Sequence, residues 1–552
     1  MNHLSSEGPA ARRPFSWRRD RAFLILLVLA VPATIAFSWQ EVLASLGDDS
    51  GSYLTLARYL SPFSSDPLTA PWAKFHSHFP PLFPLLLVLT GGAYNLLAAH
   101  LAVAACALLA LFLVYRYATL RLGSPGAGFL VALLFLLTPS AWVSIRSILS
   151  EPLYLSLTLA AIIYHDRRVD EEGVKGEFIV FGGLMAAAYL TRVAGIALIA
   201  AYATHVAVRA IGRRKLPSPW TFVPVILPLA LAGVWLVLRP QPDVDNYRLT
   251  LGGILEHWLS DPTVAAMSLE SLFGGWMASF TGDSGVGSSM RLLFGAVGIM
   301  GVAGALLGAR RNRLDSWYVL ASLAMLFLWV FPEDNTRRLL YPLLALLLVH
   351  AAEALASACA YLQRSRLRGR VLFAGWAFVA VMTMPATLLV GEKALDREPL
   401  IPGFAYSASS MTEYYTRVNV AQARALARRH ATVLAGLGSL DRMTPPGSRV
   451  MWMRPEYVAL LGRRPGSAWY YGWDRSALAR EIVRTGTGYL VAARLFKSDL
   501  AGHDGDAFAA LAVSPAPYLR PVMVIATDDA PQEFVLLEVD RAALDLYLQK
   551  GS

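Results

Sequence analysis

Long apolar runs recur along this chain, and they constrain what it can fold into more than any other feature. They measure 15 to 23 residues, close to the length that a helix needs to cross about 30 Å of hydrocarbon. We count eleven, at residues 22–39, 93–115, 127–144, 148–164, 177–191, 193–211, 220–238, 292–308, 317–331, 339–358 and 371–390. The stretches 127–164 and 177–211 also allow other divisions. The sequence therefore predicts an α-helical polytopic membrane protein with about eleven transmembrane helices.

The composition agrees with this class. Hydrophobic residues make up 55% of the 552 positions and charged residues only 16%, with a mean hydropathy of +0.46. Soluble proteins carry roughly a quarter charged residues. The net charge of +10 comes from Lys and Arg in short loops between apolar runs, so we interpret it as an orientation signal and expect no nucleic-acid partner. Cys106 and Cys359 lie within or at the end of apolar runs, and they suggest neither a disulfide framework nor a metal site.

The distribution of basic residues predicts the orientation. A basic arm, residues 1–21, precedes the first apolar run, which lacks a small-residue cleavage site and is interpreted as a signal anchor. Every second loop is basic as well, with Arg116 and Arg121; Arg167, Arg168 and Lys175; Arg213, Arg214 and Lys215; Arg310, Arg311 and Arg313; and Arg364, Arg366, Arg368 and Arg370. The positive-inside rule places the arm and these loops in the cytoplasm. Eleven crossings then leave the first loop, 40–92, and the C-terminus outside the membrane.

Two regions outside the spans have patterns of their own. Residues 80–90 are apolar, proline-rich and too short to span, which predicts an interfacial or re-entrant piece. After residue 391, strand and helix patterns alternate. We expect helices at 414–436, 454–462 and 476–486, and strands at 448–453, 488–493, 521–527 and 533–539. Residues 391–552 are therefore predicted to form a small soluble α/β domain outside the membrane.

Asp48 and Asp49 are the first candidates for chemistry. They follow the first apolar run, and a carboxylate pair at a membrane surface is costly unless it stays hydrated or has a function. A carboxylate placed there can act as general base for an incoming hydroxyl. The alternative is structural, because Asp49 or Ser50 would also suit the cap of a helix that carries Tyr53. The two interpretations are compatible.

Glu151 is a second acidic candidate. It stands before Pro152, and this pair suits the first turn of a helix, whose positive end favours a carboxylate. That structural account is sufficient by itself. However, the predicted topology places Glu151 on the same side of the membrane as Asp49, so the two carboxylates could face one cavity.

Three arginines lie on the predicted outer side, against the orientation rule. They are Arg192, between the fifth and sixth apolar runs, and Arg337 with Arg338, at the start of the tenth. Phosphate recognition would explain their position, because a guanidinium offers paired hydrogen-bond donors. The alternatives are snorkelling to the interface or pairing with Glu333 or Asp334.

The first loop also carries Lys74, His76 and His78. A His-x-His pair is a weak metal signal unless further ligands can be placed. A solvated loop is the alternative interpretation of these three residues.

Five short motifs, taken in order, resemble the bacterial branch of the GT-C glycosyltransferases, which includes lipid A aminoarabinose transferases and relatives of the protein O-mannosyltransferases. The motifs are Asp49-x-x-x-Tyr53 with Ala57-Arg58; Pro80-Pro81-Leu82-Phe83-Pro84-Leu85; Leu149-Ser150-Glu151-Pro152-Leu153; Leu190-Thr191-Arg192; and Arg337-Arg338-Leu339-Leu340-Tyr341-Pro342. They lie on one predicted side of the membrane and together cover most of residues 20–390. The resemblance implies a GT-C catalytic domain over residues 22–390, followed by the soluble α/β domain at 391–552.

The resemblance also implies roles for individual residues. Asp49, four positions before Tyr53, best matches the catalytic carboxylate of the family's first outer loop, with Asp48 as the alternative. Glu151 matches a second acidic position, and either Arg337 or Arg338 is expected near the donor phosphate. The expected substrate-binding residues are Tyr53, Arg58, Lys74, His76, His78, Arg192, Arg337, Arg338 and Tyr341. Phe79 stands where the aminoarabinose branch has a lysine before its loop proline.

The implied reaction transfers a sugar from a polyprenyl-phosphate carrier to a lipid, glycan or protein hydroxyl outside the membrane. Some GT-C enzymes use a divalent metal, but this sequence shows no closed ligand set, so we assign none. A transporter or lipid flippase is the main alternative, because it would also explain the spans and a buried carboxylate. It explains less well the odd span count and the large outer domain. A non-catalytic membrane assembly subunit is a further alternative.

Overall fold

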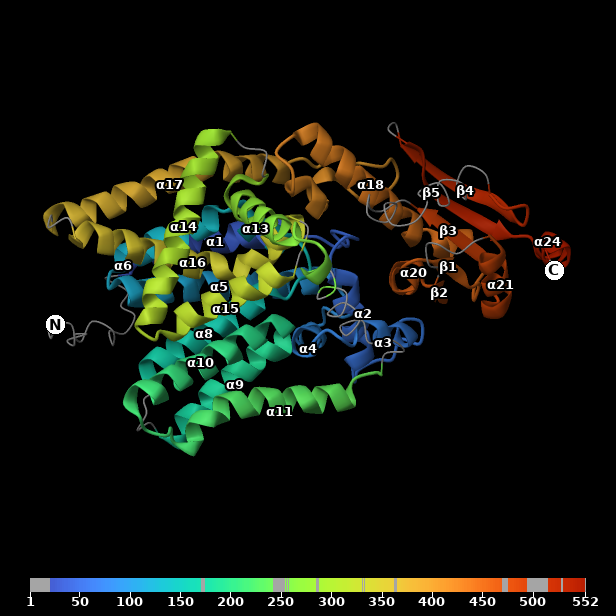
Figure 1. Cartoon of the computed structure of the whole chain (residues 1–552). Coiled ribbons are helices and arrows are strands. Elements are labelled where there is room, and N and C mark those ends of the chain that lie inside the picture. The colour runs from blue at the N-terminus through green and yellow to red at the C-terminus, as the bar shows by residue number, and fades with distance from the viewer. Residues whose placement is uncertain are drawn as a thin grey trace. The chain divides into compact units, whose positions relative to one another are not determined.

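The computed structural model describes residues 20–169, 174–241, 258–283, 287–329, 333–361, 365–468, 475–493, 515–527 and 530–551, with residues 254, 256 and 331. The chain forms two compact units (Figure 1). The helical unit comprises Met1–Trp39, Ser77–Leu86 and Leu97–Glu392. The loop–sheet unit comprises Gln40–His76, Leu87–Leu96 and Lys393–Ser552. Most of the predicted first loop, 40–92, therefore belongs to the same compact unit as the C-terminal domain.

The helices of the helical unit overlap the predicted apolar runs, with the exception of α13. They are α1 (Arg21–Ser38), α5 (Leu96–Leu122), α6 (Pro125–Leu137), α7 (Pro139–Arg146), α8 (Glu151–Arg168), α9 (Lys175–Thr191), α10 (Ile196–Arg213), α11 (Val223–Leu238), α13 (Val264–Thr281), α14 (Ser288–Arg310), α15 (Leu314–Leu328), α16 (Glu333–Tyr361) and α17 (Ser365–Ala394). The short α4 (Leu82–Leu89) lies in the proline-rich stretch that was predicted to be too short to span.

The predicted count of eleven spans is not confirmed. In the described part of the chain, seven helices are long and apolar enough to cross a membrane, or eight if α6 and α7 form one span with a bend of 58°. The helices α9 and α15 have only 17 and 15 residues, and α8 carries charged residues at both ends. Prediction from apolar runs counts such helices as full spans. The class of multi-pass helical membrane protein stands.

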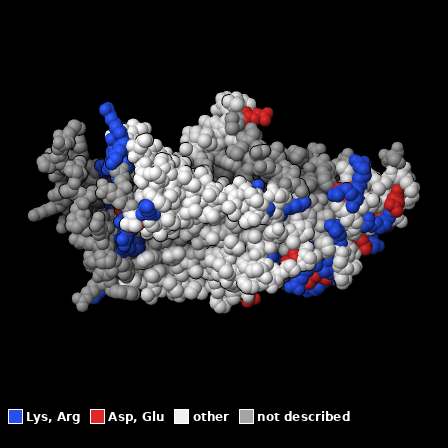
Figure 2. Space-filling model, turned by 90° about the horizontal axis from the view of Figure 1, so that it is seen from below, with Lys and Arg blue, Asp and Glu red and all other residues white. Residues whose placement is uncertain are grey.

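The apolar surface of the helical unit agrees with a hydrocarbon environment. On the face shown in Figure 2, charged side chains are sparse over the middle of the helical unit. Large apolar side chains such as Val237 and Ile299 are more than 70% exposed. In contrast, 72% of the apolar window of α16 is buried, against 17% for the window that contains α11. Helix α16 is therefore the centre of this unit, and α11 lies at its edge.

Close helix packing in this unit depends on small residues. A Cβ added at Gly304 of α14 would lie 2.1 Å from the carbonyl oxygen of His350 in α16. Only glycine allows this approach of two helix backbones, which is a common device in membrane helix packing.

Helix α13 is an addition to the sequence prediction, which placed no apolar run between residues 238 and 292. Its side chains from Gly274 to Thr281 are buried, and it packs against α14, α15 and α16. Because Glu270 and several small residues dilute its apolar character, the run did not resemble a span. Its helicity follows from packing rather than from its own hydrophobicity.

The loop–sheet unit contains a C-terminal region of mixed helices and strands, which confirms the predicted α/β character of this region. Its main elements are α2 (Ser50–Leu60), α3 (Ala73–His76), α18 (Val420–Gly438), α19 (Leu440–Met443), β1 (Val450–Trp452), α20 (Pro455–Gly462), β2 (Gly466–Ala468), α21 (Arg475–Thr485), β3 (Tyr489–Ala493), β4 (Leu519–Thr527), β5 (Ala530–Val539) and α24 (Arg541–Gly551). The strand order is β2-β1-β3-β5-β4, with β1 parallel to β2 and β3, and β5 antiparallel to β3 and β4.

Three details of this unit differ from the prediction. The short strand β2 and the C-terminal helix α24 were not expected. Helix α18 begins at Val420 rather than near residue 414, because the side chain of Asn419 accepts a hydrogen bond from the backbone N–H of Gln422 and caps the helix there. Residues Thr412–Tyr415 form a separate 3₁₀ turn.

Candidate active site

The Asp48–Asp49 turn starts helix α2. Asp49 occupies the N-cap position by its backbone, but its side chain makes no capping hydrogen bond. Instead, Asp48 Oδ1 accepts from the backbone N–H of Ser50 at 2.8 Å. Asp48 therefore supplies the local turn interaction that the structural alternative had assigned to Asp49 or Ser50. Tyr53, one turn into α2, is only 1% exposed.

His76 lies beside Glu456, a residue of the C-terminal domain in the same compact unit. His76 Nε2 is 3.8 Å from Glu456 Oε1. Burial and, to a smaller extent, the positive charge of Arg454 lower the pKa of His76 to about 4, with Asp49 acting in the opposite direction. Burial likewise raises the pKa of Glu456. The geometry thus favours a neutral imidazole here at neutral pH.

His76 predicts a pH dependence of stability. Between pH 6.5 and about 4 the unfolded chain binds a proton at His76 that the folded chain does not bind. The free energy of unfolding therefore decreases as the pH falls through this window, by roughly 2 kcal/mol at pH 5. We expect His76→Gln to lose less stability than wild type between pH 7 and pH 5, measured by thermal unfolding in detergent. Parallel pH profiles for the two proteins would contradict a lowered pKa at His76.

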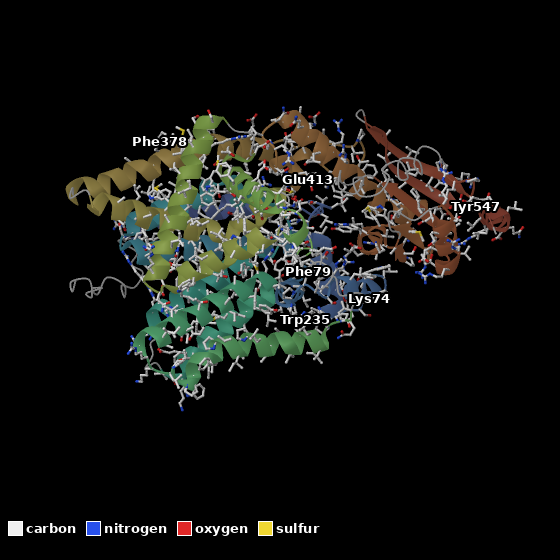
Figure 3. All side chains as sticks on the ribbon, viewed as in Figure 1. Lys74, Phe79, Trp235, Phe378, Glu413 and Tyr547 are labelled. Carbon is white, nitrogen blue, oxygen red and sulfur yellow. The ribbon has the colours of Figure 1, made fainter. Side chains whose placement is uncertain are left out.

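The other first-loop candidates have different surroundings. Arg58 Nη1 pairs with Asp66 Oδ2 at 2.9 Å, and Arg58 Nε donates to Ala93 O at 3.0 Å, so this side chain joins two parts of the loop. Lys74 Nζ lies 5.4 Å from the ring centroid of Phe75 (Figure 3). His78 belongs to the helical unit, with its ring 4.2 Å from that of Phe79.

In the helical unit, Glu151 pairs with two of the predicted arginines. Helix α8 begins at Glu151 with proline in its first turn, as predicted. Glu151 Oε1 lies 2.8 Å from Arg192 Nη1 and 2.7 Å from Arg338 Nε, and the Glu151 side chain is fully buried. Arg192 Nη1 also donates to Ser150 Oγ at 3.0 Å. We call Glu151, Arg192 and Arg338 the Glu151 cluster. Its one negative and two positive charges give a formal sum of +1, which suits an anion.

The structure separates Arg337 from Arg338, which the sequence could not do. Arg337 is 4% exposed, and its Nη1 donates to the backbone oxygen of Gly282 at 3.4 Å. Helix α13 approaches its backbone closely, since a Cβ at Gly275 would lie 2.8 Å from Arg337 N. Tyr341 is fully buried with its ring 5.4 Å from that of Phe135. The side chains of Glu333 and Asp334, the proposed alternative partners, lie outside the described residues.

A second buried carboxylate cluster was not singled out from the sequence. Asp315 Oδ2 lies 2.9 Å from Arg121 Nε and 2.7 Å from Arg313 Nη2, and it accepts from the Tyr117 hydroxyl at 2.7 Å. Arg121 also pairs with Asp166 near the end of α8. Glu151 and Asp166 are 15 residues apart in α8, roughly 22 Å along its axis. The two clusters therefore lie at opposite ends of this helix.

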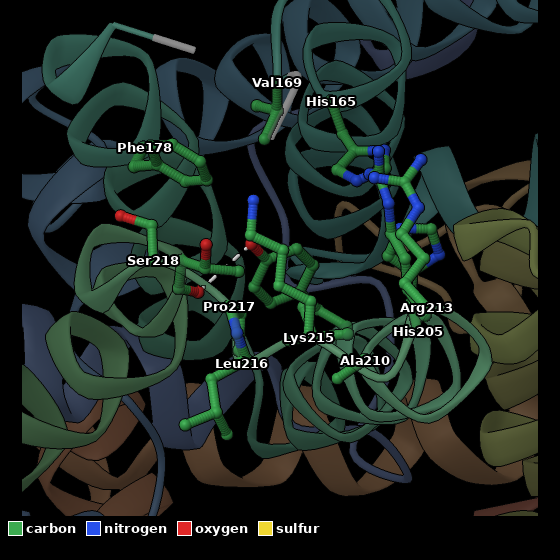
Figure 4. A pocket seen from close by; sticks show the side chains of 14 residues that line it. His165, Val169, Phe178, His205, Ala210, Arg213, Lys215, Leu216, Pro217 and Ser218 are labelled. Atoms are coloured by element: carbon green, nitrogen blue, oxygen red, sulfur yellow. Dashed lines mark hydrogen bonds between the residues drawn. The ribbon is translucent and has the colours of Figure 1, made fainter. Parts of the chain in front are cut away.

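A cavity of about 260 Å³ opens in the helical unit near the predicted cytoplasmic loops (Figure 4). Its lining combines the imidazoles of His165 and His205 with the cationic side chains of Arg209, Arg213 and Lys215. It contains none of the site residues predicted from the sequence. Among the described residues, no group of three or more His, Cys, Asp or Glu side chains is arranged to hold a metal ion.

No protein-family model and no curated protein sequence matches this chain. Among solved structures, it is similar to ArnT from Cupriavidus metallidurans. The apo ArnT structure matches with a TM-score of 0.54 and 14% identity, covering 95% of this chain and 99% of ArnT. The structure of ArnT bound to undecaprenyl phosphate matches with a TM-score of 0.53 and 15% identity, covering 95% and 98%. The chain has an ArnT-like fold.

ArnT is an aminoarabinose transferase. The similarity confirms the predicted fold class, a polytopic helical membrane protein with a C-terminal α/β region. An oligosaccharyltransferase, AglB from Archaeoglobus fulgidus, also matches, with a TM-score of 0.46 and 14% identity over 86% of this chain and 70% of AglB. At these levels of identity the comparison bears on the fold, and function has to be argued from the residues.

Three residues near the Asp48–Asp49 turn were not predicted as site residues from the sequence. Arg454, Glu456 and Tyr457 belong to the start of α20 in the C-terminal domain, and this helix packs against α2 in the same compact unit. No motif marks them, and only the fold brings them to the Asp48–Asp49 turn.

Proposed function

We propose that this protein is a GT-C glycosyltransferase that transfers a sugar from a polyprenyl-phosphate carrier to an acceptor hydroxyl outside the cytoplasmic membrane. The observation that carries the proposal is the ArnT-like fold over 95% of the chain, which includes a match to ArnT bound to undecaprenyl phosphate. The buried, net positive Glu151 cluster supports it, because a phosphate group is the kind of ligand that paired guanidinium groups bind.

Asp49 is proposed as the general base. The acceptor hydroxyl attacks the anomeric carbon of the sugar and gives its proton to the Asp49 carboxylate. The bond between the anomeric carbon and the phosphate oxygen breaks, and polyprenyl phosphate leaves with one additional negative charge. This role is supported by the family spacing to Tyr53 and by the position of Asp49 at the start of α2.

Arg338 and Arg192 are proposed to bind the donor phosphate. Charge grows on the phosphate oxygens as the leaving group departs, and fixed guanidinium donors stabilise that charge. The pairing of both arginines with Glu151 holds their side chains in place before the carrier binds. We prefer Arg338 to Arg337 for this role because Arg338 pairs with Glu151, whereas Arg337 donates to the backbone oxygen of Gly282.

The direct test is an assay of purified protein with a labelled polyprenyl-phosphate sugar. Transfer of label to a lipid, glycan or protein acceptor supports the proposal. A panel of donor sugars and of envelope fractions as acceptors would define the substrates. Movement of an intact labelled carrier across vesicles, without transfer to an acceptor, would instead favour the transporter or flippase alternative.

The orientation is part of the proposal and gives a separate prediction. We place the C-terminal domain outside a bacterial inner membrane. The basic loops lie on the same predicted side as the basic N-terminal arm, and eleven predicted crossings put the C-terminus on the opposite side. Alkaline phosphatase fused after residue 545 should therefore be active, and a reporter that works only in the cytoplasm should be silent at the same position. The reverse result would place the C-terminus and the Asp48–Asp49 turn in the cytoplasm.

A further inference from the structure

The loop that leads into the Asp48–Asp49 turn is held by the C-terminal domain. Within the loop–sheet unit, the backbone N–H of Thr412 donates to Ala44 O at 2.8 Å. The hydroxyl of Ser45 donates to the carboxylate of Glu413, which also lies 3.0 Å from Nδ1 of His430 (Figure 3). Residues far apart in the sequence thus fix the chain just before the two aspartates.

Arg454 makes the next contact along the loop. Its Nη1 donates to the carbonyl oxygen of Leu46 at 2.7 Å, two residues before Asp48. The guanidinium carbon also lies 5.7 Å from the ring centroid of Tyr457. A hydrogen bond from a charged donor is stronger than a neutral one, so this contact restrains the backbone on the N-terminal side of the aspartates.

Tyr457 makes a contact on the other side of the turn. Its side chain is fully buried. A Cβ added at Gly51, two residues after Asp49, would lie 2.4 Å from Tyr457 Cζ and 2.6 Å from its hydroxyl oxygen. The ring therefore rests directly on the first turn of α2. One helix start, α20, contacts the loop both before and after the two aspartates.

The Tyr457 hydroxyl has a further feature. It is buried and has no hydrogen-bond partner among the described residues. Burial raises the pKa of this hydroxyl and the charge of Arg454 opposes the rise, while Asp48, Glu456 and Asp49 add to it, so the group lies within electrostatic reach of both aspartates. Buried tyrosine hydroxyls normally have a hydrogen-bond partner. Since this one has none among the described residues, a ligand hydroxyl would supply it.

We propose that Arg454 and Tyr457 are positioning residues for the Asp48–Asp49 pair, and that the Tyr457 hydroxyl binds a hydroxyl group of the substrate. The inference rests on the proposed glycosyltransferase function for its catalytic consequence. Its structural part, the restraint of the loop by α20, does not depend on that function. The C-terminal domain thereby becomes part of the site that holds the candidate general base.

Arg454→Met tests the restraint, with Arg449→Met as the matched control. Arg449 also donates one hydrogen bond to a backbone carbonyl, that of Gly466 at 3.3 Å, but this contact lies within the C-terminal domain. Arg454→Met should lower kcat about tenfold or more with little change in donor KM, and Arg454→Lys should recover part of the loss. Arg449→Met should keep wild-type kcat.

Hydrogen exchange gives a readout that needs no catalysis. In Arg454→Met, the backbone amides of residues 46–53 should exchange faster than in wild type, whereas Arg449→Met should leave them unchanged. Equal exchange and equal kcat in the two variants would overturn the positioning role of Arg454. Faster exchange in a protein whose wild type transfers no sugar would uphold the restraint and reject the glycosyltransferase proposal.

Tyr457→Phe removes the hydroxyl and keeps the ring, so it tests the role of the hydroxyl alone. Because the hydroxyl has no hydrogen-bond partner among the described residues, its removal should leave the Tm unchanged or slightly raised, while kcat/KM falls about tenfold. Tyr518→Phe is the opposite control, since the Tyr518 hydroxyl donates to Arg475 O at 2.9 Å. That variant should lose stability and keep its activity. Wild-type kcat/KM in Tyr457→Phe would overturn the substrate contact.

The contact between Gly51 and Tyr457 can be tested by a double-mutant cycle. Alanine usually stabilises a helix relative to glycine, but here its Cβ would collide with the Tyr457 ring. Gly51→Ala should therefore lower the Tm in the wild-type background and have little effect in a Tyr457→Ala background. Additive effects of the two substitutions would show that the ring does not rest on Gly51.

Discussion

Asp49→Asn should lower turnover by roughly two orders of magnitude or more, because a positioned general base contributes about 10²–10⁴ in rate. Asparagine has nearly the same size but cannot accept the proton. The Asp49 side chain makes no capping hydrogen bond to α2, so the Tm and donor binding should stay close to wild type. The measurement is sugar transfer by the purified variant, with thermal unfolding recorded on the same preparation.

Asp48→Asn is the matched control for this substitution. Asp48 Oδ1 accepts a hydrogen bond from Ser50 N, and the side-chain oxygen of asparagine can accept the same bond. The loss of turnover should therefore be mild. Near-normal turnover in Asp49→Asn would transfer the role to Asp48 or Glu151. If Asp49→Asn, Asp48→Asn and Glu151→Gln all kept near-normal turnover, the proposed enzyme function itself would be wrong.

The sequence predicted those parts of the fold that depend on local pattern. Apolar runs identified the long helices because the length and hydrophobicity of a span are local properties. The prediction failed where packing decides the structure. Helix α13 contains Glu270 and is buried through its neighbours, and the three-residue strand β2 exists because it pairs with β1. The count of eleven spans stays a prediction, because a short helix such as α15 has the same local signal as a longer one.

The candidate site was likewise predicted only where the signal is local in the sequence. The motifs identified Asp49, Glu151 and the arginines as residues at helix ends, but pairings between distant segments carry no local signal. No sequence signal distinguishes Arg338 from Arg337, whereas the structure distinguishes them by their partners. Arg454 was missed because an arginine before a proline-started helix is ordinary, and only the fold brings it to the carbonyl of Leu46.

The Glu151 cluster leads to the second large effect. Glu151 is fully buried between Arg192 and Arg338, and breaking a buried ion pair by removing one partner typically costs about 3–5 kcal/mol. Glu151→Gln should therefore lower the Tm strongly. Asp315→Asn is its matched control, because Asp315 is equally buried between two arginines, at the other end of α8. Both variants should be destabilised, so stability alone cannot separate a binding cluster from a structural one.

The rise in Tm on addition of polyprenyl phosphate should distinguish a phosphate-binding cluster from a structural one. If the phosphate binds Arg192 and Arg338, it replaces the missing carboxylate in Glu151→Gln and should raise the Tm of this variant more than that of wild type. In Asp315→Asn the rise should equal that of wild type, since the arginines around Asp315 lie roughly 22 Å away along α8. Arg338→Ala should show a smaller rise and a higher donor KM, with partial recovery in Arg338→Lys because lysine lacks the paired donors. An equal rise in Tm on addition of polyprenyl phosphate in Glu151→Gln and Asp315→Asn would exclude the Glu151 cluster as the phosphate site. It would mean that loss of the carboxylate between Arg192 and Arg338 does not change binding of the carrier.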